Sequence, residues 1–175
     1  AFLKLFEPGQ IGKVEIRNRI VMPPMGSALA ELDGRFSRRQ IDYFVERARG
    51  GVGLIITEAT QTSAGVETLP TFPIARSDLD SLIPAMADLA DAVHAYGAKI
   101  AMQITAGFGR QAAAADPANP PVSASAVPAF ANPAVTCRPL TIEEIHHLVE
   151  AAGAAAGRAL MAGFDMVEIH GHTGY

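Results

Sequence analysis

The sequence has little cysteine, no tryptophan and no long hydrophobic run. Its single cysteine, Cys137, excludes an internal disulfide and any metal or iron–sulfur site built from several cysteines of this chain. No apolar run approaches the ~20 residues that a transmembrane helix needs, and the N-terminal AFLKLFEPG is too short and wrongly composed for a secretory signal. The formal net charge is -4, so the basic excess typical of nucleic-acid-binding proteins is also absent. These absences favour a soluble cytoplasmic protein.

Hydrophobic residues, in contrast, are plentiful. They make up 49% of the 175 residues, and charged residues make up 18%. Such a composition supports a buried core and argues against disorder. The length corresponds to about one domain.

The apolar pattern predicts alternating strands and helices. Four short apolar segments predict strands near 19–25, 52–59, 98–105 and 164–170. Helical spacing of apolar residues predicts helices over about 37–49, 80–96 and 142–162. Ser37 is a good N-cap, and Thr141 with Glu144 forms a capping box. Mostly apolar strands are typical of a parallel sheet that is covered on both faces.

Two features of this pattern bear on the later packing. The third helix is expected to turn these side chains inward: Ile145, Leu148, Val149, Ala152 and Leu160. Two connections, 60–78 and 106–140, are long for a compact domain, and loops of that length are usually functional or partly disordered.

The order of strands and helices fits a doubly wound open sheet or part of an eight-stranded barrel. Both architectures gather functional residues at the carboxyl ends of the strands. An open nucleotide-binding sheet would carry a glycine-rich phosphate turn after its first strand, whereas this chain has Pro23-Pro24-Met25-Gly26. That favours a barrel. A complete barrel takes eight βα units, so the chain supplies about four units, or half, of a TIM (β/α)8 barrel.

Alternation along the last two strands predicts which side chains enter the barrel. Glu168 and His170 would point inward from the fourth strand, and Lys99 and Gln103 from the third. An inward lysine and glutamate on neighbouring strands predict a structural ion pair. Catalytic use of Glu168 is the alternative.

The chain ends in FDMVEIHGHTGY, where His170, His172 and Tyr175 lie close together. No helical histidine motif supports zinc, so no metal site is predicted. Imidazole can polarise a carbonyl oxygen, and tyrosine can donate a proton, which favours contact with substrate or cofactor. The side-chain amide of Gln103 can form hydrogen bonds with the edge of a ring that bears N–H and C=O groups, or it can be a core group whose hydrogen bonds are made within the protein. Arg110 is either a surface cation or a ligand for an anionic group.

Four blocks of sequence carry a resemblance to a known family. They are LFEPGQIGKVEIRNRIVMPPMG, GGVGLIITEAT, AKIAMQI and GFDMVEIHGHTGY. In this order they resemble the N-terminal half of the old yellow enzyme family, whose members are NADH:flavin oxidoreductases on a TIM barrel. The chain looks most similar to the branch of 2,4-dienoyl-CoA reductase, 2-enoate reductase and trimethylamine dehydrogenase.

The resemblance implies an activity and cofactors. Hydride would pass from NADH or NADPH through FMN to an activated alkene: an enoate, an enone or a dienoyl thioester. Residues 1–175 would form a partial FMN-binding barrel whose remaining strands, with the flavin phosphate site, lie outside this chain. A longer parent protein of this branch would also carry 4Fe–4S and FAD.

The resemblance also implies roles for particular residues. Tyr175 would be the proton donor, and His170 would lie near both the flavin and the substrate. The flavin-binding residues would be Pro23, Pro24, Met25, Gly26, Ala59, Gln103 and His170. The chain departs from relatives that have a second histidine before the G-Y pair, because Thr173 is at that position and the histidine, His172, comes one residue earlier. Gly26 also lacks the side chain with which other members contact the flavin.

Two other hypotheses remain beside an ene-reductase acting on a small molecule. The chain could be a half-barrel without independent catalysis that requires a second half or self-association as a homo-oligomer, since half a barrel leaves sheet edges and apolar surface exposed. It could also belong to an aldolase-like barrel that uses a metal or processes a carbonyl group without flavin.

Overall fold

A parallel β-sheet forms the centre of the molecule. The computed structural model describes residues 2–67, 73–113 and 115–175. The sheet consists of β3 (Val21–Met22), β4 (Leu54–Ile56), β5 (Thr60–Gln61), β6 (Lys99–Thr105) and β9 (Met166–Ile169). Neighbouring strands are parallel, β4 and β5 both pair with one side of β6, and β9 pairs with the other. All four predicted strands are therefore present, with shorter bounds.

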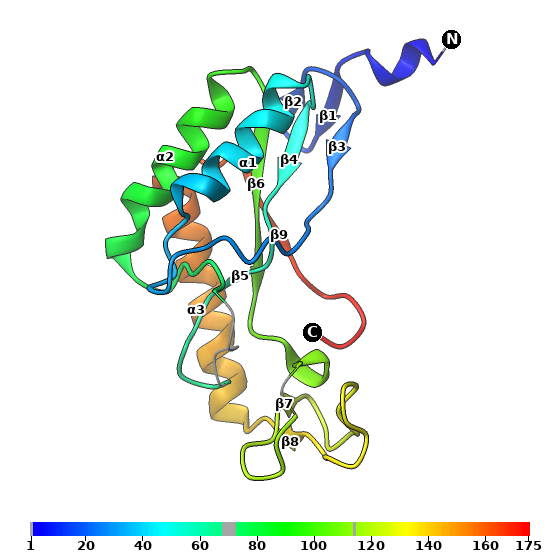
Figure 1. Cartoon of the computed structure of the whole chain (residues 1–175), viewed down its shortest axis with the longest axis vertical. Helices are drawn as coiled ribbons and strands as arrows, with labels where there is room; N and C mark the ends of the chain where they lie inside the picture. The colour runs from blue at the N-terminus through cyan, green and yellow to red at the C-terminus, as the bar shows by residue number, and fades with distance from the viewer. Residues whose placement is uncertain (1, 68–72, 114) are drawn as a thin grey trace.

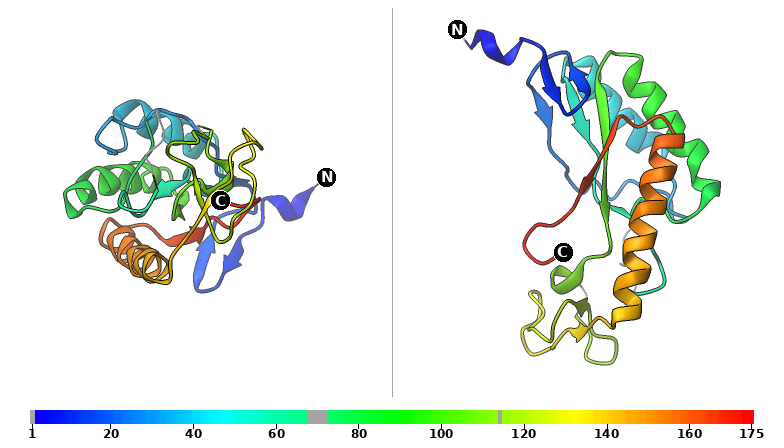
Figure 2. Two further views of the ribbon diagram at one scale, coloured as in Figure 1. Left: turned by 90° about the horizontal axis from the view of Figure 1, so that it is seen from below. Right: turned by 180° about the vertical axis from the view of Figure 1, so that it is seen from behind.

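Helices lie in an arc on one face of this sheet (Figures 1 and 2). They are α1 (Arg38–Arg49), α2 (Ile83–His94), which follows the 3-10 turn η2 (Asp80–Leu82), and α3 (Ile142–Met161). The main core fills the space between these helices and the outer face of the sheet, with Phe44, Ile55, Met86, Leu89, Ile100 and Met102 fully buried. Ile100, Met102 and Ile104 of β6 belong to this core, so they point toward the helices, as the predicted inward orientation of Lys99 and Gln103 requires.

The predicted N-terminal caps of α1 and α3 are confirmed, whereas α2 is shorter than the predicted helix over 80–96. Ser37 Oγ accepts the Gln40 N–H at 3.1 Å, and Thr141 and Glu144 form the reciprocal capping box. After α1 the chain turns at Gly51, whose φ of 101° is in the left-handed region that glycine adopts without steric cost.

The inward face of α3 differs from the prediction. Val149 and Leu160 are 67% and 75% exposed, while Ala155 and Ala159 are the buried residues of the helix. The small side chains of Ala155 and Ala159 allow α3 to approach the sheet closely. Because the alanine face of the helix packs against the sheet, Val149 and Leu160 point away from it. Ile169 at the end of β9 is likewise 78% exposed.

The opposite, inner face of the sheet carries a smaller cluster. Leu54 and Ala101 pack there with Ile16, which belongs to the antiparallel hairpin of β1 (Gly9–Ile11) and β2 (Val14–Ile16). The hairpin therefore covers the inner face near the amino ends of the strands.

The predicted ion pair between Lys99 and Glu168 is wrong. Lys99 Nζ contacts Asp165 Oδ1 at 2.7 Å, and Asp165 also accepts hydrogen bonds from His94 and from the Ile100 N–H. Glu168 instead pairs in register with Gln103. Lys99 is four residues before Gln103, about 13 Å along the strand, so it lies at the opposite end of the sheet from Glu168.

A bulge interrupts the predicted second strand. Ile56 pairs with Ala101 and Thr60 with Ile104, so four steps along one strand match three along β6. The extra residue lies within 57–59, at the carboxyl end of the strand, where bulges commonly redirect side chains. Thr57 Oγ1 accepts the Gln103 N–H there at 3.1 Å.

The long connection after β6 is partly structured. It begins with η3 (Gly109–Gln111) and contains β7 (Val122–Ser123) and β8 (Arg138–Pro139), which pair in parallel. A small cluster of Ala129, Val135 and Cys137 packs inside it. Part of the other long connection, 68–72, lies outside the described residues. Near the N-terminus, η1 spans Leu3–Leu5. Within the described residues, no helix has the length and apolar character to cross a membrane.

Candidate functional site

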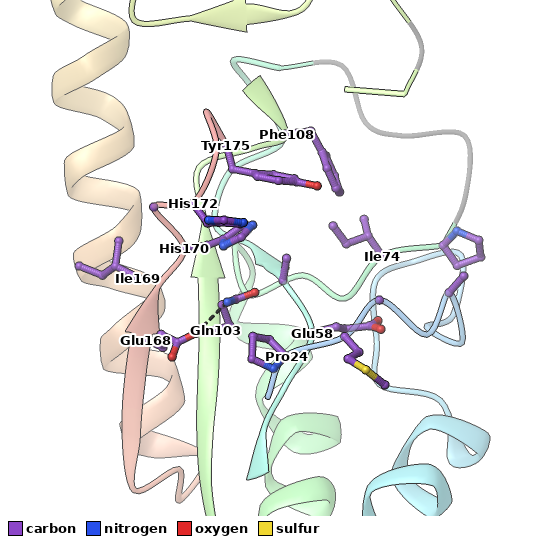
Figure 3. Close-up of a pocket in the computed structure, with 16 residues that line it drawn as sticks. Pro24, Glu58, Ile74, Gln103, Phe108, Glu168, Ile169, His170, His172 and Tyr175 are labelled. Carbon is purple, nitrogen blue, oxygen red and sulfur yellow. Dashed lines mark hydrogen bonds between the residues drawn. The ribbon is translucent and has the colours of Figure 1, made fainter. Parts of the chain in front are cut away.

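A cavity of about 890 Å³ opens at the carboxyl ends of the strands (Figure 3). Eight of the predicted site residues line it: Pro24, Met25, Gly26, Ala59, Gln103, His170, His172 and Tyr175. Pro23 is not among the residues that line the cavity. The rim predicted from the parallel topology is therefore where the candidate residues meet.

One side of the cavity is formed by backbone and small or apolar side chains. The segment Pro24–Gly26 follows β3, and Ala59 follows β4 in the bulge. A Cβ built on Gly26 would meet no heavy atom within 4 Å, so this position adjoins open space. The surface can accept a flat apolar group.

A polar pair lies on the strands beside this surface. Gln103 Nε2 donates to Glu168 Oε1 at 2.7 Å (Figure 3). Both side chains point into the cavity because they are register partners on adjacent parallel strands. This bond uses one of the two N–H groups of the Gln103 amide. The second N–H and the amide oxygen remain for hydrogen bonds with the edge of a bound ring.

Aromatic side chains form the wall near the end of the chain. The ring centroids of His170 and Tyr175 are 4.3 Å apart, and those of Phe108 and Tyr175 are 5.9 Å apart. The His170 N–H donates to the Ile104 carbonyl at 2.9 Å, which extends the pairing of β9 with β6. Tyr175 therefore packs between the strand end and the loop that carries Phe108 (Figure 3).

A tight turn brings Tyr175 back over His170. Thr173 and Gly174 have φ of 52° and 96°, and the Tyr175 N–H donates to the His172 carbonyl at 3.1 Å. Gln111 Nε2 donates to the Thr173 carbonyl at 2.7 Å. A Cβ on Gly174 would meet Arg110 Cγ and Cδ at 2.8 Å. Arg110 thus packs its stem against the turn and is not among the residues that line the cavity.

The environment of His170 disfavours its charged form. Burial lowers its pKa, and the nearby His172 lowers it further, although Glu168 acts in the opposite sense. His170 is therefore mainly neutral imidazole at neutral pH, with one N–H donor and one acceptor nitrogen. Among the described residues, no three or more His, Cys, Asp or Glu side chains are grouped so that they could hold a metal ion.

The other cavity residues were not predicted as site residues: Ala28, Glu58, Pro73, Ile74, Phe108, Glu168, Ile169 and Gly171. Glu58 had a detectable signal, because a carboxylate directly after an apolar strand belongs to the same rim as Gln103. Phe108 comes from the glycine-containing loop after β6, whose path the sequence did not reveal.

Parallel strands, helices on one face and a cavity at the carboxyl-terminal rim together define half of a TIM (β/α)8 barrel. The chain belongs to the NADH:flavin oxidoreductase / NADH oxidase family, whose family model matches residues 4–175. The resemblance found in the sequence is thereby confirmed. This family uses FMN with NADH or NADPH.

Individual relatives agree with this assignment. The chain is 43% identical to cinnamate reductase of Clostridium sporogenes over 98% of its length, and 44% identical to NADH oxidase of Thermoanaerobacter brockii over 99%. It spans 26% of each of these proteins. A solved structure of morphinone reductase in complex with tetrahydroNAD superimposes with a TM-score of 0.79 at 32% identity. The match covers 94% of this chain and 48% of that one.

The residues present fit one side of a flavin ring. The open space at Gly26, the small Ala59 and the amide of Gln103 provide a flat apolar surface with a polar edge. A flat heterocycle bearing N–H and C=O groups needs that combination. His170 and Tyr175 are on the opposite part of the same cavity, where a second small molecule could contact them.

Proposed function

We propose that the protein containing this chain is an FMN-dependent NAD(P)H oxidoreductase that reduces an activated alkene. The observation that carries this proposal is the shared cavity: a flat apolar surface with a single amide faces a cluster of His170, His172 and Tyr175. The substrate class we propose is an enoate, an enone or a dienoyl thioester. The similarity to cinnamate reductase supports an enoate.

The flavin would contact the apolar surface. We propose that Pro23, Pro24, Met25, Gly26 and Ala59 hold the ring, with Pro23, which does not line the cavity, contributing through the backbone. Gln103 would hydrogen-bond the edge of the ring while Glu168 keeps its amide in place. FMN, when bound, supplies the hydride chemistry, and the protein provides orientation and polarisation.

The histidines and the tyrosine would handle the substrate. An N–H of neutral His170 or of His172 can donate to the carbonyl oxygen that activates the alkene, and such donors stabilise the negative charge that develops there. The phenol O–H of Tyr175 is the proposed proton donor to the α-carbon. His172 lines the same cavity, so it is our candidate to replace the histidine that relatives have at the position of Thr173.

The remaining parts of the enzyme would come from outside residues 1–175. These parts are the other strands of the barrel and the flavin phosphate site. The small share of the cinnamate reductase and NADH oxidase chains that is covered, 26%, supports a long protein. The 4Fe–4S cluster and FAD that we propose for it come from the resemblance to the multidomain branch.

The exposed apolar side chains support a partner for this half-barrel. Ile169 and Leu160 are 78% and 75% exposed, which is unfavourable for apolar groups in water. We propose that the rest of the barrel covers them, either in the same chain or in an associated one, including a homo-oligomer. Mass spectrometry of the purified protein separates these cases by the length of the intact chain.

The test of the proposed function uses the full-length protein. Anaerobic addition of NADH or NADPH should bleach the flavin absorption, and an enoate such as cinnamate should restore it. Tyr175→Phe should leave flavin content and bleaching unchanged but slow alkene reduction by roughly 10²-fold or more, the usual contribution of general acid catalysis.

Tyr96→Phe is the matched control, because Tyr96 is 43% exposed and follows α2 at the opposite end of the sheet. It should behave like the wild type in both half-reactions. A full-length protein that releases no flavin on denaturation would refute the proposed function. Equal alkene reduction by Tyr175→Phe and the wild type would refute only the role of Tyr175.

A further inference from the structure

A buried carboxylate at the side of the cavity has no catalytic task in the function proposed above. Glu58 is 4% exposed and follows β4 in the bulge, from which it lines the cavity (Figure 3). None of the ion pairs among the described residues includes it. An unpaired carboxylate in such a place needs hydrogen-bond donors to offset its lost hydration.

Both oxygens of Glu58 accept hydrogen bonds from other parts of the chain. Oε2 accepts the backbone N–H of Ser27, and Oε1 accepts from Gln40 Nε2 at 2.5 Å. Two N–H donors facing two oxygens form the pattern that an ionised carboxylate satisfies. Glu58 therefore joins the bulge, the segment after β3 and the first turn of α1.

The Gln40 side chain is committed to this contact. It is fully buried, and its Nε2 also lies 3.4 Å from Ser27 Oγ. Its Oε1 is buried and has no hydrogen-bond partner among the described residues. The amide is thus oriented so that its nitrogen contacts Glu58 and Ser27, while its oxygen is buried without a hydrogen bond from any described residue. The contacts with Glu58 and Ser27 therefore determine the position of the amide.

The segment held by Glu58 has few other anchors. Residues 23–30 contain no helix or strand, Met25 is 53% exposed, and Gly26 has no side chain. Ala28 has a φ of 52°, a left-handed conformation that costs energy for a residue with a Cβ. Such a conformation persists only when the surroundings impose it, and the bond from Glu58 acts on the residue directly before it.

We infer that Glu58 is a positioning residue. Through Ser27 it fixes the Pro24–Gly26 surface at the cavity and so determines where the flavin ring lies. The inference rests on the proposed function, because it concerns the surface that would contact the flavin. Gln40 supports Glu58 from the opposite side.

The experiment compares Glu58→Gln and Gln40→Met in the full-length protein, with Glu15→Gln as the matched control. Glutamine at position 58 has nearly the same shape as glutamate, but its NH2 group would face either the Ser27 N–H or Gln40 Nε2, which are both donors. Glu15 is exposed on β2, away from the cavity. We expect each of the first two variants to raise the Kd for FMN about tenfold, which corresponds to ~1.4 kcal/mol. Both should shift the visible circular dichroism of the bound flavin in the same way, and the double variant should add little to either one.

A second measurement does not require flavin. Hydrogen exchange of a peptide covering residues 23–30 in the flavin-free protein should accelerate about tenfold in both variants and stay unchanged in Glu15→Gln. Wild-type exchange, FMN affinity and flavin spectrum in Glu58→Gln would overturn the inference while leaving the proposed function intact. Lower thermal stability with an unaltered flavin spectrum would also overturn it, since that outcome describes a merely structural residue. A wild-type protein without flavin would refute the proposed function itself.

Discussion

Replacing Glu67 by glutamine should remove a pH-dependent contact beside the cavity. Glu67 is 6% exposed, and its Oε2 accepts the N–H of Phe108, which lines the cavity next to Tyr175. A Cβ on Gly107 would clash with Oε2, so the carboxylate lies directly against the backbone of this loop. Its other oxygen is buried and has no hydrogen-bond partner within the described part of the chain.

Burial determines the protonation of this group. It raises the pKa of Glu67 from 4.5 to about 7, although the N–H groups of Phe108 and Gly109 act in the opposite direction. When the loop opens, Glu67 regains water and its ordinary pKa. The closed loop therefore holds the proton more tightly than the open loop. Its stabilisation is complete below about pH 4.5, is lost as the pH rises to about 7, and is constant above that.

The size of the effect follows from the two pKa values. One pKa unit corresponds to about 1.36 kcal/mol, so the closed loop should lose about 3 kcal/mol across this range, or roughly two orders of magnitude in the opening equilibrium. Hydrogen exchange of a peptide containing Phe108 and Gly109, corrected for the intrinsic pH dependence of exchange, should show this loss of protection. Glu67→Gln should give a flat profile, and Glu15→Gln should keep the wild-type profile. A flat wild-type profile, or an unchanged slope in Glu67→Gln, would refute the reasoning.

Two further changes test interactions that hold the half-barrel together. Asp165→Asn should lower the free energy of unfolding at pH 7 by about 2 kcal/mol, because the contacts of the carboxylate with Lys99 and His94 are lost. Burial alone would raise the pKa of Asp165, but these bonds outweigh it and lower the pKa below 3.8. The difference in free energy of unfolding between variant and wild type, measured with denaturant, should therefore shrink as the pH falls below 3.8. A difference that stays constant with pH would contradict this account. Thr141→Ala should cost about 1 kcal/mol by removing the cap of α3, and Thr141→Ser, which keeps the hydroxyl, should restore most of that loss in thermal unfolding.

Local signals were the most reliable guide to the fold. Capping residues and terminal glycines act within one turn of a helix, so Ser37 and Thr141 could be identified without knowing the tertiary structure. The apolar strands likewise indicated a parallel sheet, and the parallel order placed Gln103 and His170 at one rim. These inferences needed only spacing along the chain.

The errors arose where spacing along the chain did not determine the partner. Alternation put Lys99 and Glu168 on the same face, but only the register of β6 against β9 shows that they are at opposite ends of it. The face of α3 was ambiguous for a related reason: alanines and larger apolar residues both recur at helical spacing, and close packing selected Ala155 and Ala159.

The bulge after β4 is another feature that spacing along the chain did not reveal, and it lies at the candidate site. A regular strand over 52–59 would give Glu58 and Ala59 opposite orientations, yet both line the cavity. One extra residue against β6, with Thr57 Oγ1 accepting the Gln103 N–H, allows both to contribute. An alternation-based reading of the sequence could not contain this feature, because a bulge is defined by the partner strand. Glu58, one of the residues that such a reading omitted, reaches the cavity because of this bulge. Its hydrogen bonds join the bulge to the cavity surface formed by Pro24–Gly26.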